Sequence, residues 1–327
     1  MHIINEDTSV MERKLYGGIM GLCVADAMGV PVEFYQRETL KQNPVVDMRS
    51  FGTYNQPAGT WSDDTSLTLC LLDSLSRGLD LYDIMDRFQN WIDRGEYTPY
   101  GEVFDVGAGT RKALDRYALG IPPRLCGGMD ERDNGNGSLM RILPLLFYLR
   151  QRFGSMFHTL DMAYAVIHDV SSLTHAHKRS QMACGIYLVI ANFIMDGKDI
   201  VQAVQQGMDQ AMLYYKAKTE FTDETIQYAR LEQSDFSGFM EAEIRSTGYV
   251  VDTLEASIWC LLTTHSYQEC ILKAVNLGDD TDTVASVAGG LAGLYYGYQS
   301  IPIAWLDTLA RREFVEELCE KFYRQEI

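Results

Sequence analysis

Paired cysteines and an excess of basic residues are both missing from this chain of 327 residues. Its seven cysteines are scattered, odd in number and never in Cys-x-x-Cys spacing. This pattern argues against a disulfide framework and a cysteine zinc site, and it suits a reducing, cytoplasmic compartment. Lys and Arg number 28 against 45 Asp and Glu, which gives a net charge of −17. Because nucleic-acid binders normally present a basic face, we do not expect a nucleic-acid partner.

Long apolar runs and a secretory signal are also lacking. The most membrane-like stretch, residues 284–297, is too short to cross a bilayer, so we expect a buried helix there. The first seven residues contain no charged region followed by an apolar one, which predicts that the chain is not secreted. We therefore expect a cytoplasmic protein with no membrane partner.

Alternating β-branched residues are scarce, whereas apolar residues recur at three- and four-residue spacing along most of the chain. This spacing predicts helices over residues 11–28, 65–76, 81–92, 139–150, 160–170, 179–195, 252–263 and 305–322. With 46% hydrophobic residues, the chain can form a sizeable core without disulfides. We expect an all-α fold, and neither a Ser- or Pro-rich linker nor a repeat divides the chain.

The stretch 216–245 differs from its surroundings because it is polar, charged and only weakly periodic. It is the best candidate for a variable insertion or a mobile flap. An ordinary pair of surface helices fits this composition equally well.

Small residues recur at every fourth position in two expected helices. The first series is Gly17, Gly21, Ala25 and Gly29, and the second is Ala285, Gly289, Gly293 and Gly297. Glycine inside a helix costs about 1 kcal/mol relative to alanine, so eight small positions in register need a reason. A ridge of small residues lets two backbones approach closely, and we expect these helices to pack against each other, antiparallel. Glu33, after the first helix, would then lie near Asp280 at the start of the second.

Two clusters of aspartates and hydroxyl residues lie at expected helix starts. The first contains Ser62, Asp63 and Asp64, and the second contains Asp280, Asp282 and Thr283. Helix capping would explain one aspartate in each cluster, but two or more exceed what a cap requires. Carboxylates gathered in one pocket would repel one another unless a cation lay between them. Since all the candidate ligands are oxygens, they favour Mg²⁺ or Mn²⁺ over zinc or copper.

Three further motifs are ambiguous when each is taken alone. Residues 134–141 form a glycine-rich turn before a helix, which suits a phosphate, although Asn-Gly pairs are mostly simple turns. His175 and His177 have no third nitrogen or sulfur ligand at a recognisable spacing, which favours ordinary surface or core histidines. Asp105 lies among apolar residues before Gly107, and by itself it is an isolated turn aspartate.

Taken together and in this order, these motifs resemble the ADP-ribosylglycohydrolase family over nearly the whole chain. The matching segments are residues 17–34, 61–65, 104–110, 135–141, 174–175 and 278–297. The resemblance implies an orthogonal all-α bundle, formed by residues 1–327 as a single domain, with two Mg²⁺ or Mn²⁺ ions in a central cleft. It also implies a metal-dependent hydrolase that releases ADP-ribose from an ADP-ribosylated protein or small molecule.

Residue by residue, the resemblance assigns ligands, substrate contacts and catalytic groups. The metal ligands would be Ser62, Asp63, Asp64, Asp280, Asp282 and Thr283, with Ser62 in place of the family's usual threonine. The diphosphate would bind the turn that contains Asn136, Gly137, Ser138 and Met140, and His175 would lie against the distal part of ADP-ribose. Glu33 matches a glutamate near the scissile bond in serine-directed members. Asp105 and Gly107 match a loop beside the acceptor in arginine-directed members, which favours arginine.

The resulting hypothesis is hydrolysis at the anomeric carbon through an oxocarbenium-like state, by analogy with other glycosidases. The ions would orient the ribose hydroxyls and activate a water, while Asp105 or Glu33 acts as general acid or base. Asp63 or Asp64 could assist while coordinated. The alternatives are a catalytically silent ADP-ribose-binding relative, a metal-dependent phosphoesterase, and a hydrolase for serine, O-acetyl-ADP-ribose or a modified base. The sequence does not indicate an oligomeric state.

Overall fold

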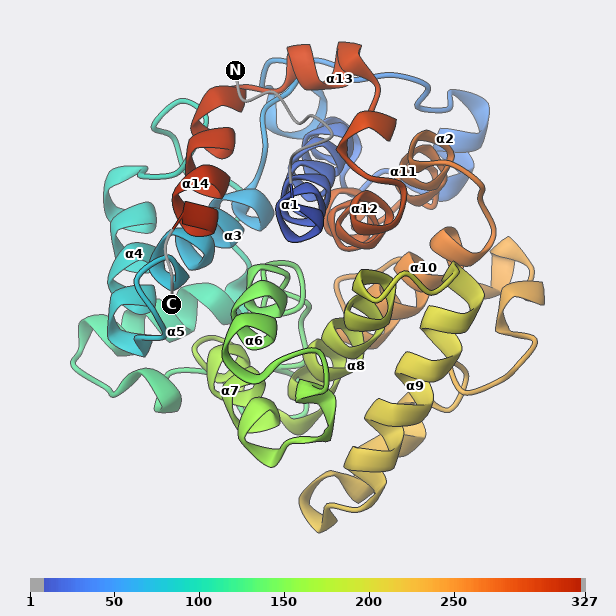
Figure 1. The fold of residues 1–327 in the computed structure, drawn as a ribbon. Helices are drawn as coiled ribbons and strands as arrows, with labels where there is room; N and C mark the ends of the chain where they lie inside the picture. The colour runs from blue at the N-terminus through green and yellow to red at the C-terminus, as the bar shows by residue number, and fades with distance from the viewer. Residues whose placement is uncertain (1–8, 325–327) are drawn as a thin grey trace.

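Helices make up the regular secondary structure of the computed structural model, which describes residues 9–324 (Figure 1). The α-helices are α1 (Val10–Gly29), α2 (Arg37–Gln42), α3 (Asp63–Leu75), α4 (Leu81–Arg94), α5 (Ala108–Ala118), α6 (Pro144–Phe153), α7 (Asp161–Ser172), α8 (Lys178–Met195), α9 (Ile200–Lys216), α10 (Val250–Leu262), α11 (Tyr267–Asn276), α12 (Thr281–Tyr296), α13 (Ile303–Thr308) and α14 (Arg312–Arg324). They run in several directions rather than as one parallel bundle (Figure 1). The predicted all-α fold is confirmed.

Short 3₁₀ segments connect many of these helices. They are η1 (Val30–Val32), η2 (Gly52–Tyr54), η3 (Pro123–Leu125), η4 (Phe157–Thr159), η5 (Thr219–Tyr228), η6 (Phe236–Gly238), η7 (Glu241–Glu243) and η8 (Tyr298–Ser300). Local sequence explains several helix ends. The Asp80 and Asp199 side chains accept backbone hydrogen bonds at the starts of α4 and α9. Gly95, with a φ of 69°, ends α4 in the left-handed conformation that glycine adopts without strain.

Two predicted helix ranges are wrong. Residues 139–143 form turns, and α6 begins only at Pro144, because proline suits the first position of a helix and lacks the N–H that an interior position needs. The range 305–322 is divided into α13 and α14, since Arg311 adopts a φ of 44° between them. The predicted ranges also left out α2, α5, α9 and α11.

The predicted antiparallel packing of the two small-residue helices is confirmed. Helices α1 and α12 lie side by side, with α3 next to α1 and α11 next to α12 (Figure 1). A Cβ atom added to Gly21 would lie 2.6 Å from the carbonyl oxygen of Gly289. Where α1 ends, the Thr281 hydroxyl donates a hydrogen bond to the carbonyl of Gly29 at 2.8 Å. Gly297 takes no part, because a Cβ added there would meet no described atom within 4 Å.

Helix α1 is the apolar axis of the core. Residues Val10–Val32 are long and apolar enough to cross a membrane, yet the whole of their most apolar window is enclosed by the rest of the fold. The prediction that residues 284–297 are the most membrane-like is therefore wrong, although α12 is a buried helix as expected. The residues that argued against a secretory signal lie outside the described part of the chain.

The segment 216–245 contains η5, η6 and η7 rather than a pair of α-helices. Five of its larger side chains are buried, namely Phe221, Tyr228, Leu231, Phe236 and Ile244, whereas Ile226 and Met240 are exposed. The Tyr228 hydroxyl donates to the carbonyl of Arg179 in α8 at 2.6 Å, and the Trp259 indole in α10 donates to the carbonyl of Phe239 at 3.1 Å. These contacts hold the segment against α8 and α10.

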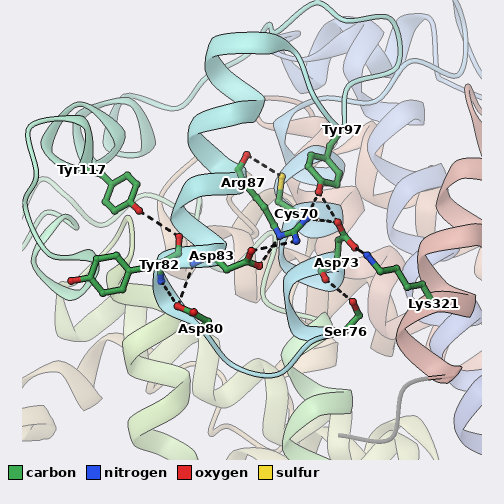
Figure 2. Close-up of polar contacts among 10 residues, drawn as sticks. All are labelled: Cys70, Asp73, Ser76, Asp80, Tyr82, Asp83, Arg87, Tyr97, Tyr117 and Lys321. Atoms are coloured by element: carbon green, nitrogen blue, oxygen red, sulfur yellow. Dashed lines mark hydrogen bonds and ion pairs between the residues drawn. The ribbon is translucent and has the colours of Figure 1, made fainter.

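A network of charged residues joins α3, α4 and α14 (Figure 2). Arg87 of α4 pairs with Asp73 of α3 and with Asp83 of its own helix, and Lys321 of α14 also pairs with Asp73. The Tyr97 hydroxyl donates to Asp73 at 2.7 Å. Burial alone would raise the pKa of Asp73, but its hydrogen bonds to Lys321 and Tyr97 outweigh burial and lower it. The network ties down α3, the helix that begins at the first acidic cluster.

Candidate active site

The two predicted acidic clusters meet where α3 and α12 begin. Asp64 Oδ2 accepts a hydrogen bond from the Thr283 hydroxyl at 3.3 Å and lies 3.2 Å from the Ser62 hydroxyl. Its other oxygen accepts from Ser286 Oγ at 2.5 Å. Asp64 and Thr283 are 219 positions apart in the chain. The expectation that these distant clusters fold into one pocket is confirmed.

Asp26 of α1 holds the start of α3, a role that the sequence analysis did not assign to it. Its carboxylate accepts hydrogen bonds from the Ser62 backbone N–H at 3.0 Å, the Ser62 hydroxyl at 2.9 Å and the Thr65 N–H at 2.9 Å. Burial raises the pKa of Asp26 to about 6. An aspartate inside the otherwise apolar stretch 15–32 was the signal that could have identified it.

Several carboxylate oxygens of this pocket lack partners. Glu33 Oε2, Asp280 Oδ1 and Asp282 Oδ2 are buried with no hydrogen bond from the described part of the chain. Ligand atoms of Glu33, Asp105 and Asp282 lie within 4.8 Å of one another. Each buried, unsatisfied polar atom costs about 1–3 kcal/mol, and a cation between such oxygens removes that cost. The all-oxygen donor set fits a hard divalent cation.

The electrostatics of the pocket agree with this assignment. Burial, followed by the charge of Asp105, raises the pKa of Glu33 to about 10. Burial and the neighbouring carboxylates likewise raise the pKa of Asp63, Asp64 and Asp282 well above the ordinary aspartate value. These carboxylates therefore resist ionisation together unless positive charge is supplied.

A cavity of about 340 Å³ opens beside the carboxylates. One part of its wall is acidic, with Glu33, Asp63, Asp105, Asp280 and Thr283. The rest of the lining includes residues 107–110 at the start of α5, the turn residues Gly135, Asn136 and Gly137, and Met140 and His175. Ser62, Asp64 and Asp282 are buried and do not belong to this wall. The cavity therefore joins the predicted metal ligands to the predicted substrate-binding turn.

Two polar residues of the predicted diphosphate turn are already engaged with the protein. The Asn136 amide donates to Asp280 Oδ2 at 2.8 Å and to Thr253 Oγ1 at 2.9 Å, so it braces the acidic cluster. The Ser138 hydroxyl is buried behind the turn, where it accepts a hydrogen bond from Ser171 Oγ at 3.0 Å. Both amide hydrogens of Asn136 are thus used within the protein, and Ser138 does not line the cavity.

His175 packs beneath the glycine residues of the cavity wall. A Cβ added to Gly137 would lie 2.7 Å from the ring, and one added to Gly109 would lie 2.8 Å from Nε2. Burial, with Arg141 as the second cause, lowers the pKa of His175 to about 3, so the ring is neutral. Its Nδ1 lies 2.9 Å from the hydroxyl of Thr174. Glycine at these two positions therefore makes room for a neutral imidazole at the cavity.

Three non-glycine residues with positive φ surround the acidic end of the cavity. They are Phe34 (65°), Asp105 (52°) and Asp279 (59°). Phe34 donates its backbone N–H to the carbonyl of Asp279 at 2.7 Å, which links two of them directly. Such conformations cost about 1–3 kcal/mol each and concentrate at functional sites. The strain thus coincides with the carboxylates of the cavity.

The fold and the cavity together define a class: an all-helical protein with a pocket of buried carboxylates beside glycine residues of the cavity lining. The sequence model of the ADP-ribosylglycohydrolase family matches residues 7–327, and the chain belongs to this family. Membership confirms both the resemblance found in the motifs and the expected class of enzyme, a hydrolase of ADP-ribosyl glycosidic bonds.

Relatives of the chain match along most of their length. It is 32% identical to the ADP-ribosylarginine hydrolase Tri1 of Serratia proteamaculans, over 98% of this chain and 81% of that protein. It is 30% identical to the ADP-ribosyl-dinitrogen reductase glycohydrolase of Rhodospirillum rubrum, over 92% of this chain and 91% of that protein. A solved ADP-ribosylglycohydrolase-related protein complex has a TM-score of 0.76 at 30% identity, covering 97% of this chain and 99% of that one.

Proposed function

We propose that this protein cleaves the N-glycosidic bond between ADP-ribose and an arginine side chain of a modified protein. The observation that carries the proposal is the junction of the two acidic clusters at Asp64, beside a cavity of about 340 Å³. The similarity to relatives named for ADP-ribosylarginine and for ADP-ribosyl-dinitrogen reductase supports arginine as the acceptor.

Two divalent cations, Mg²⁺ or Mn²⁺, are the proposed cofactors. Their ligands would be Ser62, Asp63, Asp64, Asp280, Asp282 and Thr283. When bound, such ions polarise hydroxyl groups and lower the pKa of a water molecule. The unsatisfied oxygens of Asp280 and Asp282 support this assignment, because each needs a positively charged or hydrogen-bonding partner.

The acid–base chemistry falls to Glu33 and Asp105, which lie at the same end of the cavity. One of these carboxylates takes a proton from the attacking water as the new C–O bond forms at the anomeric carbon. The C–N bond breaks with its electron pair passing to the guanidine, which then receives the proton. The other carboxylate hydrogen-bonds to the guanidinium N–H groups and orients the acceptor.

The glycine-rich part of the cavity lining suits the ADP part of the substrate. Helix α5 begins at this wall with Gly107 as its N-cap, and the positive end of a helix dipole favours a phosphate. Lys112 and Arg132 also line the cavity and supply positive charge to an otherwise acidic protein. Gly135, Gly137 and the neutral His175 would contact the distal part of ADP-ribose.

The test is release of free ADP-ribose, read by mass, from ADP-ribosyl-arginine protein, ADP-ribosyl-serine peptide and O-acetyl-ADP-ribose. With Mg²⁺ or Mn²⁺ present, we expect the arginine substrate to be cleaved fastest. Asp63→Ala and Asp282→Ala should abolish turnover, whereas Asp209→Ala, an exposed aspartate on α9, should not. Full activity in EDTA-stripped protein would rule out a role for the cations in turnover. Preference for the ADP-ribosyl-serine peptide would rule out arginine as the main acceptor. Binding of ADP-ribose without turnover of any substrate would favour a silent relative.

Two further expectations belong to this proposal. Residues 1–327 form one ADP-ribosylglycohydrolase domain in which 216–245 is the variable segment, packed on α8 and α10. The protein acts in the cytoplasm, since its seven cysteines are all free and buried, as a reducing compartment allows.

A further inference from the structure

Tyr54, the last residue of η2, contacts both carboxylates of the proposed acid–base pair. Burial and the two carboxylates raise the pKa of the Tyr54 hydroxyl, and Tyr54 in turn lowers the pKa of Glu33 against the larger effect of burial, so all three groups lie in one cluster. Tyr54 is half-buried and is not one of the residues that line the cavity. We therefore treat Tyr54 as a group that acts on the reaction through the two carboxylates.

The ring of Tyr54 contacts the same two chain segments as its hydroxyl. Its centroid lies 4.9 Å from the ring of Phe104 and 6.5 Å from that of Phe34. Phe34 directly follows Glu33 and Phe104 directly precedes Asp105, so each carboxylate has an aromatic neighbour in the sequence that packs on Tyr54. Aromatic pairs of this kind stabilise a defined relative orientation of their segments.

The segment that carries Tyr54 is itself attached to the segment that carries Glu33. Thr53 Oγ1 donates a hydrogen bond to the carbonyl of Glu33 at 2.7 Å, and a Cβ added to Gly52 would overlap the carbonyl of Pro31. The loop with Asp105 is instead half-exposed and has a positive φ of 52° at Asp105 itself. Tyr54 thus extends from a segment attached to Glu33 to the loop that carries Asp105.

We propose that Tyr54 is the positioning residue that sets the separation and orientation of Glu33 and Asp105. A phenolic hydroxyl donates one hydrogen bond and accepts others, so it can serve two carboxyl groups at once. The inference rests on the proposed function, in which these two carboxyl groups flank the scissile bond. Small displacements of a catalytic group lower the rate of the chemical step far more than they weaken substrate binding.

The experiment compares Tyr54→Phe, which keeps the ring, with Tyr54→Leu, which removes it, in steady-state assays of ADP-ribose release with Mn²⁺. The substrate is whichever acceptor the wild type cleaves. We expect Tyr54→Phe to lower kcat about 10- to 100-fold with little change in KM. Tyr54→Leu should lower kcat further, because the loop with Phe104 loses its aromatic contact. Tyr35→Phe is the matched control, since it removes the same hydroxyl two residues after Glu33 and should leave kcat unchanged.

A second measurement needs no substrate and separates this inference from the proposed function. The urea midpoints of Tyr54→Phe, Asp105→Asn and the double variant form a double-mutant cycle, which we expect to be non-additive. If the shifts in urea midpoint of the two single variants add up to that of the double variant, the positioning role is wrong. A wild-type kcat in Tyr54→Phe would also overturn it. An equal loss of kcat in Tyr35→Phe would overturn it too. If the wild type cleaves no ADP-ribosyl-arginine while the cycle is non-additive, only the proposed acceptor fails.

Discussion

Gly289→Ala is the substitution that most directly tests the packing of α1 against α12. A Cβ at position 289 would lie 2.5 Å from both the Cβ of Ala25 and the carbonyl oxygen of Gly21. Ordinary contacts of this kind are 3.4–4 Å, so the two helices must separate locally by about 1 Å. Because the obstacles are a backbone atom and the first atom of a short side chain, no rotamer change can relieve the overlap.

The expected magnitude follows from two opposing effects. Overpacking of this severity costs about 3 kcal/mol, and alanine's better helix propensity returns about 1 kcal/mol. The net loss in the free energy of unfolding is therefore about 2 kcal/mol. With an unfolding entropy of about 2.1 cal/mol/K per residue over 327 residues, the midpoint temperature falls by about 3 °C. Since Asp282 lies two turns earlier on α12, we also expect weaker metal binding.

Urea and thermal unfolding of the wild type, Gly289→Ala and Gly18→Ala would check this value. Gly18 is the control on α1, because a Cβ there would meet only side-chain atoms, at 3.0 Å from Leu294 and 3.3 Å from Leu143. Those side chains can move, so Gly18→Ala should be as stable as the wild type or slightly more stable. A Gly289→Ala protein as stable as Gly18→Ala would show that the two backbones do not pack as described.

Three other predictions test the charged groups of the protein. Mn²⁺ at 100 times its Kd should stabilise chelator-treated protein by about 2.7 kcal/mol and raise its melting temperature by about 4 °C. In Asp64→Asn, Mn²⁺ should no longer raise the melting temperature. An unchanged melting temperature in the wild type would contradict a cation site. Burial lowers the pKa of His168 to about 3, below its value near 6.5 in the unfolded chain. The neutral His168 therefore contributes fully to the free energy of unfolding above about pH 6.5, and this contribution declines as the pH falls toward 3. Relative to His168→Phe, the wild type should lose about 1.4 kcal/mol in urea unfolding between pH 7.5 and 5.5, and parallel pH profiles would refute this. Arg87→Met removes one of the two cationic side chains that pair with Asp73, and we expect the free energy of unfolding to fall by about 3 kcal/mol. A loss below about 0.5 kcal/mol in thermal unfolding would mean that the network in Figure 2 contributes little to stability.

Much of the fold could be predicted because its determinants are local or periodic. Apolar spacing identified most of the long helices, and the two series of small residues predicted that α1 and α12 are antiparallel partners. The failures have local causes too. Pro144 starts a helix that periodicity alone would have begun at residue 139, and the left-handed backbone at Arg311 divides a continuous apolar stripe.

The candidate site was only partly predictable for a different reason. Motifs identified the oxygen-rich clusters around Asp64 and Asp282, because unusual residue types at a helix start are visible in the sequence. They did not identify Asp26 or Tyr54, each of which is an ordinary residue type whose partners lie elsewhere in the chain. The turn that contains Asn136 and Ser138 was expected at a phosphate, and the sequence did not indicate that these two side chains contact Asp280 and Ser171.

The sequence by itself therefore determined the helical architecture, the all-oxygen ligand chemistry and the helices that pack most closely. Tertiary structure alone decided which carboxylates lack partners, that His175 is neutral, and that one tyrosine spans Glu33 and Asp105. The physical reason is that burial and charge–charge distance depend on contacts between residues far apart in the chain. Helix propensity, capping and small-residue spacing depend instead on neighbours within a few positions.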